Sequence, residues 1–163
     1  MPRRWSKLQR RIREIFDPNI RLQFHCAIYR IPGHVDTVCP RYFLMLNSKI
    51  IWDWPRDYSG DLSYEQMYLV YRDSASRISD SIADYLNSDR KVALSLRDGW
   101  GILDILRAAD RRIGRRHWDG LLENINPKVS IAVEMIIIAR KNSGRGSMKN
   151  KRNNEDTNMP KIH

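Results

Sequence analysis

The stretch RAADRRIGRRHW, residues 107–118, concentrates side chains that can bind a polyanion. It holds five arginines and one histidine against a single aspartate. The planar guanidinium group of arginine matches the oxygens of a phosphate. On a helical wheel that starts at Ile102, Arg107, Arg111 and Arg115 follow one another at i, i+4 and i+8, opposite the apolar face. This spacing predicts either a ridge that contacts phosphates or the solvated face of an ordinary helix.

Two aspartates bear on this choice. Asp104 falls among the arginines, where it can pair with Arg107 or Arg111, a pair worth a few tenths of a kcal/mol. Asp110 falls near the apolar edge, which favours a buried partner for an arginine over a catalytic acid. Arg112 lies at the flank of the ridge. The sequence leaves open whether the ridge binds an anion or is merely solvated.

Basic residues also gather at both ends of the chain, whose net charge is +10. Residues 1–16 carry six Lys/Arg and one Glu, and residues 142–163 carry five Lys/Arg against two acids. Charge asymmetry of this kind indicates what a protein binds rather than how it folds. The predicted nucleic-acid-binding residues are Arg3, Arg4, Lys7, Arg10, Arg11, Arg107, Arg111, Arg112 and Arg115.

Metal chemistry has little support in the sequence. His25, Cys26, His34 and Cys39 do not have the spacing of the usual zinc sites. His25 and Cys26 are neighbours on a predicted strand, so their side chains point to opposite faces. We predict no metal site and no cofactor. The two cysteines in a chain of 163 residues suggest a reducing compartment.

Acid–base catalysis has one candidate group, formed by His25, Asp53 and Asp57, which depends entirely on the fold bringing them together. The sequence has no phosphate-cradling glycine loop, no nucleophile elbow and no histidine–glutamate zinc motif. A small hydrolase or nuclease is therefore the third-ranked function.

The N-terminal basic residues lie on an amphipathic pattern. Trp5, Leu8, Ile12 and Phe16 share one helical face, and Asp17-Pro18 ends the helix. Such a helix can lie on a membrane surface, bind a polyanion or dock on a sheet. All three remain open here.

Three strands are expected next, over residues 20–31, 41–46 and 49–54, with a loop at 32–40 and a tight hairpin at Asn47-Ser48. On the last strand, Trp52 and Trp54 share a face. Tryptophans there either stack bases or form the core, and a sheet that packs against helices favours the core.

Helical periodicity dominates from residue 62. Ser63 and Gln66 form a capping box that opens a helix over 64–87. Residues 88–98 fit either a short strand or a helical turn. Further helices are predicted over residues 101–113 and around residues 117–122. A last helix is predicted from Asn126-Pro127 to residue 141, where a strand is the alternative. Residues 142–163 are predicted to be a disordered basic tail.

The motifs WSKLQRRI, IIWDWP and ILRAADRRIG occur in an order that resembles a family of small uncharacterised bacterial proteins. The likeness spans roughly Trp5 to Arg140. It implies a bacterial cytosolic protein and a helix in the last segment. It implies no activity, cofactor or catalytic residue.

Together these patterns predict one α+β domain over residues 1–141: a three-stranded antiparallel meander with an N-terminal helix and several C-terminal helices packed on one face. No apolar run is long enough to span a membrane and the first residues lack a secretory signal, so we expect a cytoplasmic protein. The leading function is a non-enzymatic module that binds RNA or DNA. The alternative is a protein-interaction module, such as an immunity or antitoxin-like partner, and the oligomeric state stays open.

Overall fold

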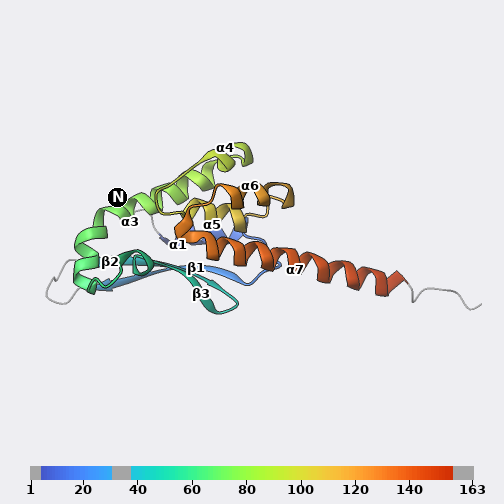
Figure 1. Cartoon of the computed structure of the whole chain (residues 1–163), viewed down its shortest axis with the longest axis horizontal. Coiled ribbons are helices and arrows are strands. Elements are labelled where there is room, and N and C mark those ends of the chain that lie inside the picture. The colour runs from blue at the N-terminus through green and yellow to red at the C-terminus, as the bar shows by residue number, and fades with distance from the viewer. Residues whose placement is uncertain (1–4, 31–37, 156–163) are drawn as a thin grey trace, which may run out of the picture.

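The computed structural model describes residues 5–30 and 38–155 (Figure 1). Helix α1 (Trp5–Ile15) precedes the strands β1 (Leu22–Arg30), β2 (Val38–Leu46) and β3 (Lys49–Trp54). The helices that follow are α2 (Arg56–Ser59), α3 (Tyr64–Asn87), α4 (Arg90–Ser95), α5 (Ile102–Ala109), α6 (Trp118–Glu123) and α7 (Ser130–Glu155), with short 3-10 turns at Arg115–His117 and Pro127–Val129.

The sheet is an antiparallel meander in the order β1-β2-β3. Asn47 and Ser48 both have positive φ, the conformation that a two-residue hairpin requires, so the predicted hairpin is confirmed. Strand β2 begins at Val38, inside the segment predicted to be a loop, because its residues pair with the end of β1. The rest of that loop prediction, residues 32–37, lies outside the described residues.

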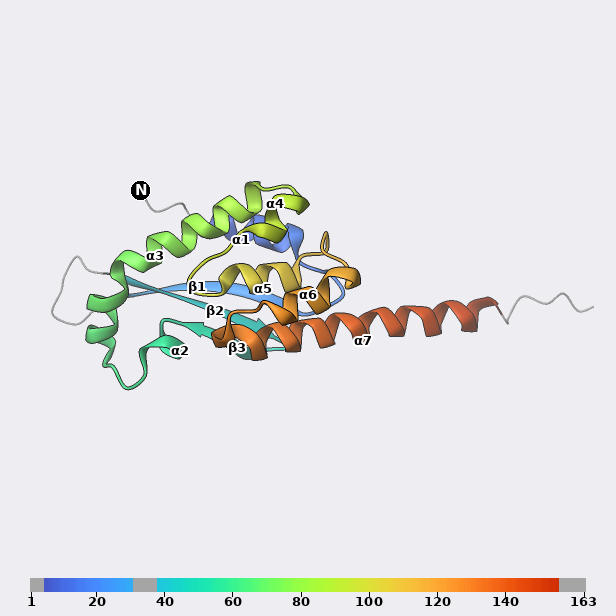
Figure 2. The same cartoon turned by 45° about the horizontal axis from the view of Figure 1, so that its top comes forward.

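One face of the sheet forms the core, and α1, α3 and α5 lie over it (Figure 2). Phe24, Leu44, Trp52 and Trp54 on this face are at most 2% exposed. The tryptophans are therefore core residues rather than stacking platforms, as predicted. The opposite face carries exposed or half-buried side chains such as Gln23 and Phe43. The predicted α+β class and its three-stranded meander are thus correct.

Helix α1 docks on the sheet, which is one of the three predicted alternatives. Its apolar stripe is buried, with Leu8, Ile12 and Phe16 at most 5% exposed. Gln9 adds a hydrogen bond from Nε2 to the Phe24 carbonyl of β1, at 2.9 Å. Burial of the apolar stripe leaves the basic side of α1 facing outward.

Local signals define the ends of α3. Ser63 and Gln66 form the predicted capping box, each side chain accepting from the other residue's backbone N–H. The following segment is the helical turn α4 rather than a strand, and Asp89 caps it by accepting from the Val92 N–H. Helix α4 packs beside α5, where it changes the environment of Arg107.

Helix α5 ends at Ala109, although the sequence predicts a helix to residue 113. Asp110 adopts an extended conformation and forms a β-bridge with Phe16. The chain then pairs with the segment after α1, because the Arg111 N–H bonds to the Ile15 carbonyl. The predicted ridge of Arg107, Arg111 and Arg115 is therefore wrong, since the three residues do not share a helix.

Helix α7 confirms the predicted last helix but runs to Glu155, well beyond residue 141. Residues 142–155 are thus helical, not a disordered tail as predicted, and residues 156–163 lie outside the described residues. The C-terminal part of α7 projects away from the other elements in both views (Figures 1 and 2). No helix among the described residues combines the length and the apolarity needed to cross a membrane.

The thiol of Cys26 should react slowly. Cys26 lies on β1, opposite Tyr42 of β2. Burial raises the pKa of its thiol to about 11. Thiolate is the reactive form, so at pH 8 Cys26 should be alkylated roughly a hundredfold more slowly than a free thiol. Iodoacetamide labelling of a Cys39→Ser variant, followed by mass spectrometry beside a cysteine peptide, measures this rate. Labelling at the peptide's rate would contradict the burial of Cys26.

Candidate nucleic-acid interface

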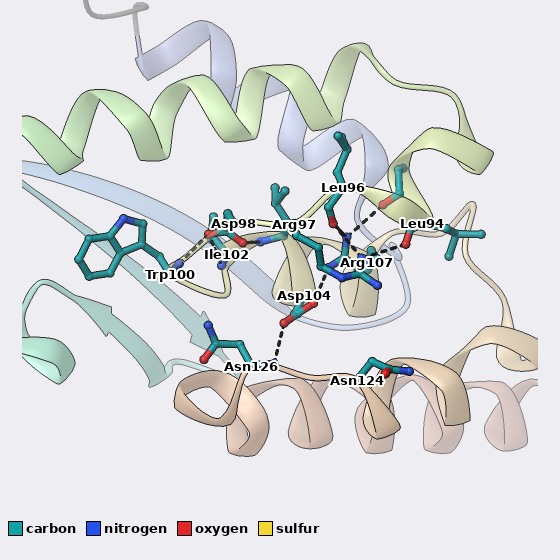
Figure 3. Close-up of polar contacts among 12 residues, drawn as sticks. Leu94, Leu96, Arg97, Asp98, Trp100, Ile102, Asp104, Arg107, Asn124 and Asn126 are labelled. Carbon is teal, nitrogen blue, oxygen red and sulfur yellow. Dashed lines mark hydrogen bonds and ion pairs between the residues drawn. The ribbon is translucent and has the colours of Figure 1, made fainter.

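Arg107, predicted to contact phosphates, is 1% exposed. Figure 3 shows its polar contacts with the neighbouring residues. Its guanidinium pairs with Asp104 and donates to the carbonyls of Ala93 and Leu96. Helix α4 and the loop after it cover the side of α5 that a helical wheel assigns to solvent. Arg107 is therefore a structural residue that joins α4 to α5, and its assignment as a ligand residue is wrong.

The same network fixes the start of α5. The Asp98 carboxylate accepts hydrogen bonds from the backbone N–H groups of Trp100, Ile102 and Leu103 (Figure 3). Burial raises the pKa of Asp98 despite these bonds, which act in the opposite direction. Asp104 also accepts from the Asn126 N–H, so the network reaches the segment that leads into α7.

Arg112 also has a structural role. Its guanidinium donates to Asp110, whose side chain is fully buried, and to the Ser88 carbonyl. Asp110 also accepts from the Tyr85 hydroxyl at 2.8 Å. The prediction that Asp110 is the buried partner of an arginine is confirmed, whereas the assignment of Arg112 to phosphate is not supported by this geometry.

A third arginine, Arg140, holds α7 against the body. Its Nε donates to Asp17 at 2.9 Å and its Nη1 to the Ala108 carbonyl at 2.7 Å. Burial alone would raise the pKa of Asp17, but hydrogen bonds from Asn19 and Arg140 outweigh it, and the pKa is lowered. Arg140 also lies over the buried ring of Trp118, 4.9 Å from its centroid. Helices α5, α6 and α7 are therefore fixed together where α7 leaves the body.

The N-terminal helix supplies fewer cations than predicted. Arg11 donates to the Leu86 carbonyl and to Asn87 at 2.9–3.0 Å, which caps the C-terminus of α3. Lys7 and Arg10 are exposed on the outer side of α1, as a ligand-binding role requires. Arg3 and Arg4 lie outside the described residues.

Four exposed cations remain where α5, α6 and α7 meet: Arg111, Arg115, Arg116 and Lys141. We call this group the basic rim. None of the four forms an ion pair within the described part of the chain. Unlike Arg107, Arg112 and Arg140, these side chains are free to contact an anion.

Arg115 connects the rim to α7. Its guanidinium passes over Gly144, where an added Cβ would lie 2.9 Å from Nη2, so a glycine permits this approach. The same group lies 3.5 Å from the Lys141 carbonyl. Arg115 and Lys141 each lie 6.0 Å from the centroid of the Trp118 ring. Arg115 and the root of α7 are therefore in direct contact.

The projecting part of α7 continues this basic character. Lys141, Arg145, Lys149 and Arg152 follow at i, i+4, i+8 and i+11, which places the four positions on one side of the helix. We call these positions the basic stripe. Residues 141–155 contain five Lys/Arg and a single acid, Glu155. A continuous line of cationic positions therefore leads away from the rim.

The candidate acid–base group lies on the open face of the sheet. Asp53 is bound through both oxygens by Arg41, and its N–H donates to Asp57 at 2.9 Å. Burial raises the pKa of Asp57, and the charge of Asp53 adds to this effect. His25 instead stacks on Phe43, with ring centroids 4.9 Å apart. The fold brings the two aspartates together, but Arg41 already neutralises Asp53.

No group of three or more metal-binding side chains occurs within residues 5–30 and 38–155. The structure adds two cations that sequence analysis missed, Arg116 and Lys141. Arg116 lies beyond Gly114 in the 3-10 turn Arg115–His117, for which the helical wheel of residues 101–113 gives no direction. Lys141 had a signal in the sequence, since it begins the i, i+4, i+8, i+11 spacing that continues through the predicted tail.

Comparison of the chain with known proteins identifies no relative. No family model matches the chain, and neither a curated protein nor a solved structure shows significant similarity to it. The resemblance to small bacterial proteins therefore stays a prediction, and function has to be argued from the rim, the stripe and their surroundings.

Proposed function

We propose that this protein binds nucleic acid through the basic rim and α7, as a non-enzymatic module. One observation carries the proposal: Arg111, Arg115, Arg116 and Lys141 are exposed and form no ion pair among the described residues, beside the basic stripe, whereas Arg107, Arg112 and Arg140 are bound by aspartates or carbonyls. A polyanion is the ligand that such a surface attracts. The contacts are to phosphates, so affinity should depend steeply on salt and weakly on sequence.

Electrostatics favours the same conclusion. Like charges at i, i+4 destabilise a helix by a few tenths of a kcal/mol per pair, and the stripe contains two such pairs, 141/145 and 145/149. Phosphates along the stripe would convert this repulsion into attraction. Lys7 and Arg10 on α1 can extend the contact, because both are exposed.

A triple variant of the rim tests the proposal. Arg111→Gln/Arg115→Gln/Arg116→Gln should weaken binding to labelled DNA and RNA by about tenfold or more at low salt, and reduce the slope of log affinity against log salt by about 2–3. Fluorescence anisotropy between 50 and 200 mM salt measures both quantities. The matched control is Arg56→Gln/Arg77→Gln/Arg90→Gln, which removes three exposed arginines from α2, α3 and α4.

Equal losses in the rim variant and the control would show that net charge, not the rim, determines affinity. Wild-type protein that binds no nucleic acid at low salt would contradict the proposal outright. That result would favour the alternative of a protein partner. Ile131 and Ile138, which are 74% and 56% exposed on α7, offer an apolar surface for such a partner.

A further inference from the structure

The projecting half of α7 has the dimensions and the polarity of an element that enters a nucleic-acid groove. Residues 141–155 form about four turns, roughly 22 Å long. Their sequence contains no Ile, Leu, Val or aromatic residue, and Met148 is the one large apolar residue. This segment therefore lacks the apolar stripe with which a surface helix packs against its own protein.

Such a segment is marginal as a helix on its own. Isolated helices of this length are barely stable in water, and Gly144 and Gly146 each cost about 1 kcal/mol relative to alanine. A ligand that contacts this segment would stabilise it as a helix. Both views show the segment standing clear of the body, where a ligand can surround it (Figures 1 and 2).

The shape of the segment selects the type of nucleic acid. An α-helix with its side chains is about 10–12 Å across, and the major groove of B-form DNA is about 12 Å wide. The major groove of A-form RNA is deep and narrow and does not admit side chains. Single strands are bound mainly by stacking on exposed aromatic rings, whereas residues 141–155 contain no aromatic residue.

We propose that duplex DNA is the preferred ligand and that residues 141–155 of α7 lie in its major groove, with the basic stripe along one phosphate backbone. The rim then contacts the phosphates where the helix enters the groove. Arg140 sets the angle of entry, because its bonds to Asp17 and Ala108 fix the root of α7. This inference rests on the proposed function and adds to it the class of duplex and the groove.

A pair of substitutions at Ser147 tests whether the helix itself matters. Ser147→Pro breaks the helix within the projecting segment, and Ser147→Ala favours it, while neither changes the charge. With the full-length protein and a labelled 20-base-pair DNA duplex, the proline variant should bind about tenfold more weakly, and the alanine variant at least as tightly as wild type. Equal affinities would show that the segment acts as a flexible basic tail, which overturns the inference.

The choice of duplex is tested with DNA and RNA duplexes of the same sequence and the corresponding single strands. Wild type should prefer the DNA duplex by about tenfold, and methyl green, a major-groove dye, should displace it while the minor-groove ligand netropsin should not. Equal or tighter binding to RNA, or displacement by netropsin alone, would overturn the inference but leave the proposed function intact. Binding to none of these probes at low salt would contradict both.

Discussion

Replacing Arg107 by methionine should lower the free energy of unfolding by about 3–5 kcal/mol, although the sequence places this residue among the phosphate ligands. The guanidinium is 1% exposed and bonds to Asp104 and to two carbonyls. Methionine fills most of the volume but leaves the buried Asp104 carboxylate without its cation. For a chain of this size the loss corresponds to a fall in Tm of roughly 10 °C.

Arg111→Met is the matched control, because it removes an exposed arginine that lies four residues further along the chain. Its effect on stability should stay within about 0.5 kcal/mol, while it weakens nucleic-acid binding. Thermal and urea unfolding measure stability, and anisotropy below the melting transition measures binding. A stable Arg107→Met protein with reduced nucleic-acid affinity would return Arg107 to the binding surface and contradict the buried geometry.

The fate of these two arginines shows what sequence patterns can predict. The wheel for residues 102–109 correctly buries Ile102, Leu106 and Ala109. It reports direction relative to the apolar face, but it contains no information on what covers the other side. That cover is α4, and residues 88–98 fit a strand as well as a helical turn, so the sequence gives no sign that Arg107 is buried.

Helix ends divide in the same way. Those set by local chemistry were predictable, as at α3, where Ser63 and Gln66 satisfy each other's backbone groups. The end of α5 depends on a distant segment, because Asp110 leaves the helix to bridge Phe16. Asp110 itself was correctly placed as a buried partner, since an acid near an apolar edge needs a cation. Its partner proved to be Arg112, two residues away.

The C-terminal half of α7 went unrecognised for a different reason. A helix is normally predicted from its apolar period, and this segment has none beyond Ala139. The positions of Lys141, Arg145, Lys149 and Arg152 carry a helical period of their own, but in charge. A regular spacing of charged residues predicts a helix only if a binding partner for that charged face is assumed. The sequence alone therefore favours a disordered tail.

Arg112→Met should cost about 3 kcal/mol, because it leaves the Asp110 carboxylate, which is 0% exposed, without its cation. The Tyr85 hydroxyl and the backbone N–H of residue 112 still donate to Asp110, but neither carries a charge. Removing the acid as well, in Asp110→Ala/Arg112→Met, eliminates the unpaired charge at the expense of one acceptor for Tyr85. The double variant should therefore be more stable than the sum of the two single losses predicts.

A double-mutant cycle of urea unfolding, built from Asp110→Ala, Arg112→Met and the combined variant, gives the coupling energy of this pair. We expect about 1.5–3 kcal/mol, the upper part of the range for residues in direct contact. Purely additive losses would mean that the two side chains do not interact. If Arg112→Met instead left stability unchanged and weakened DNA binding as much as a rim substitution, Arg112 would belong with Arg111 and Arg115 on the surface. The cycle thus separates the arginines that hold this fold together from those left free to bind.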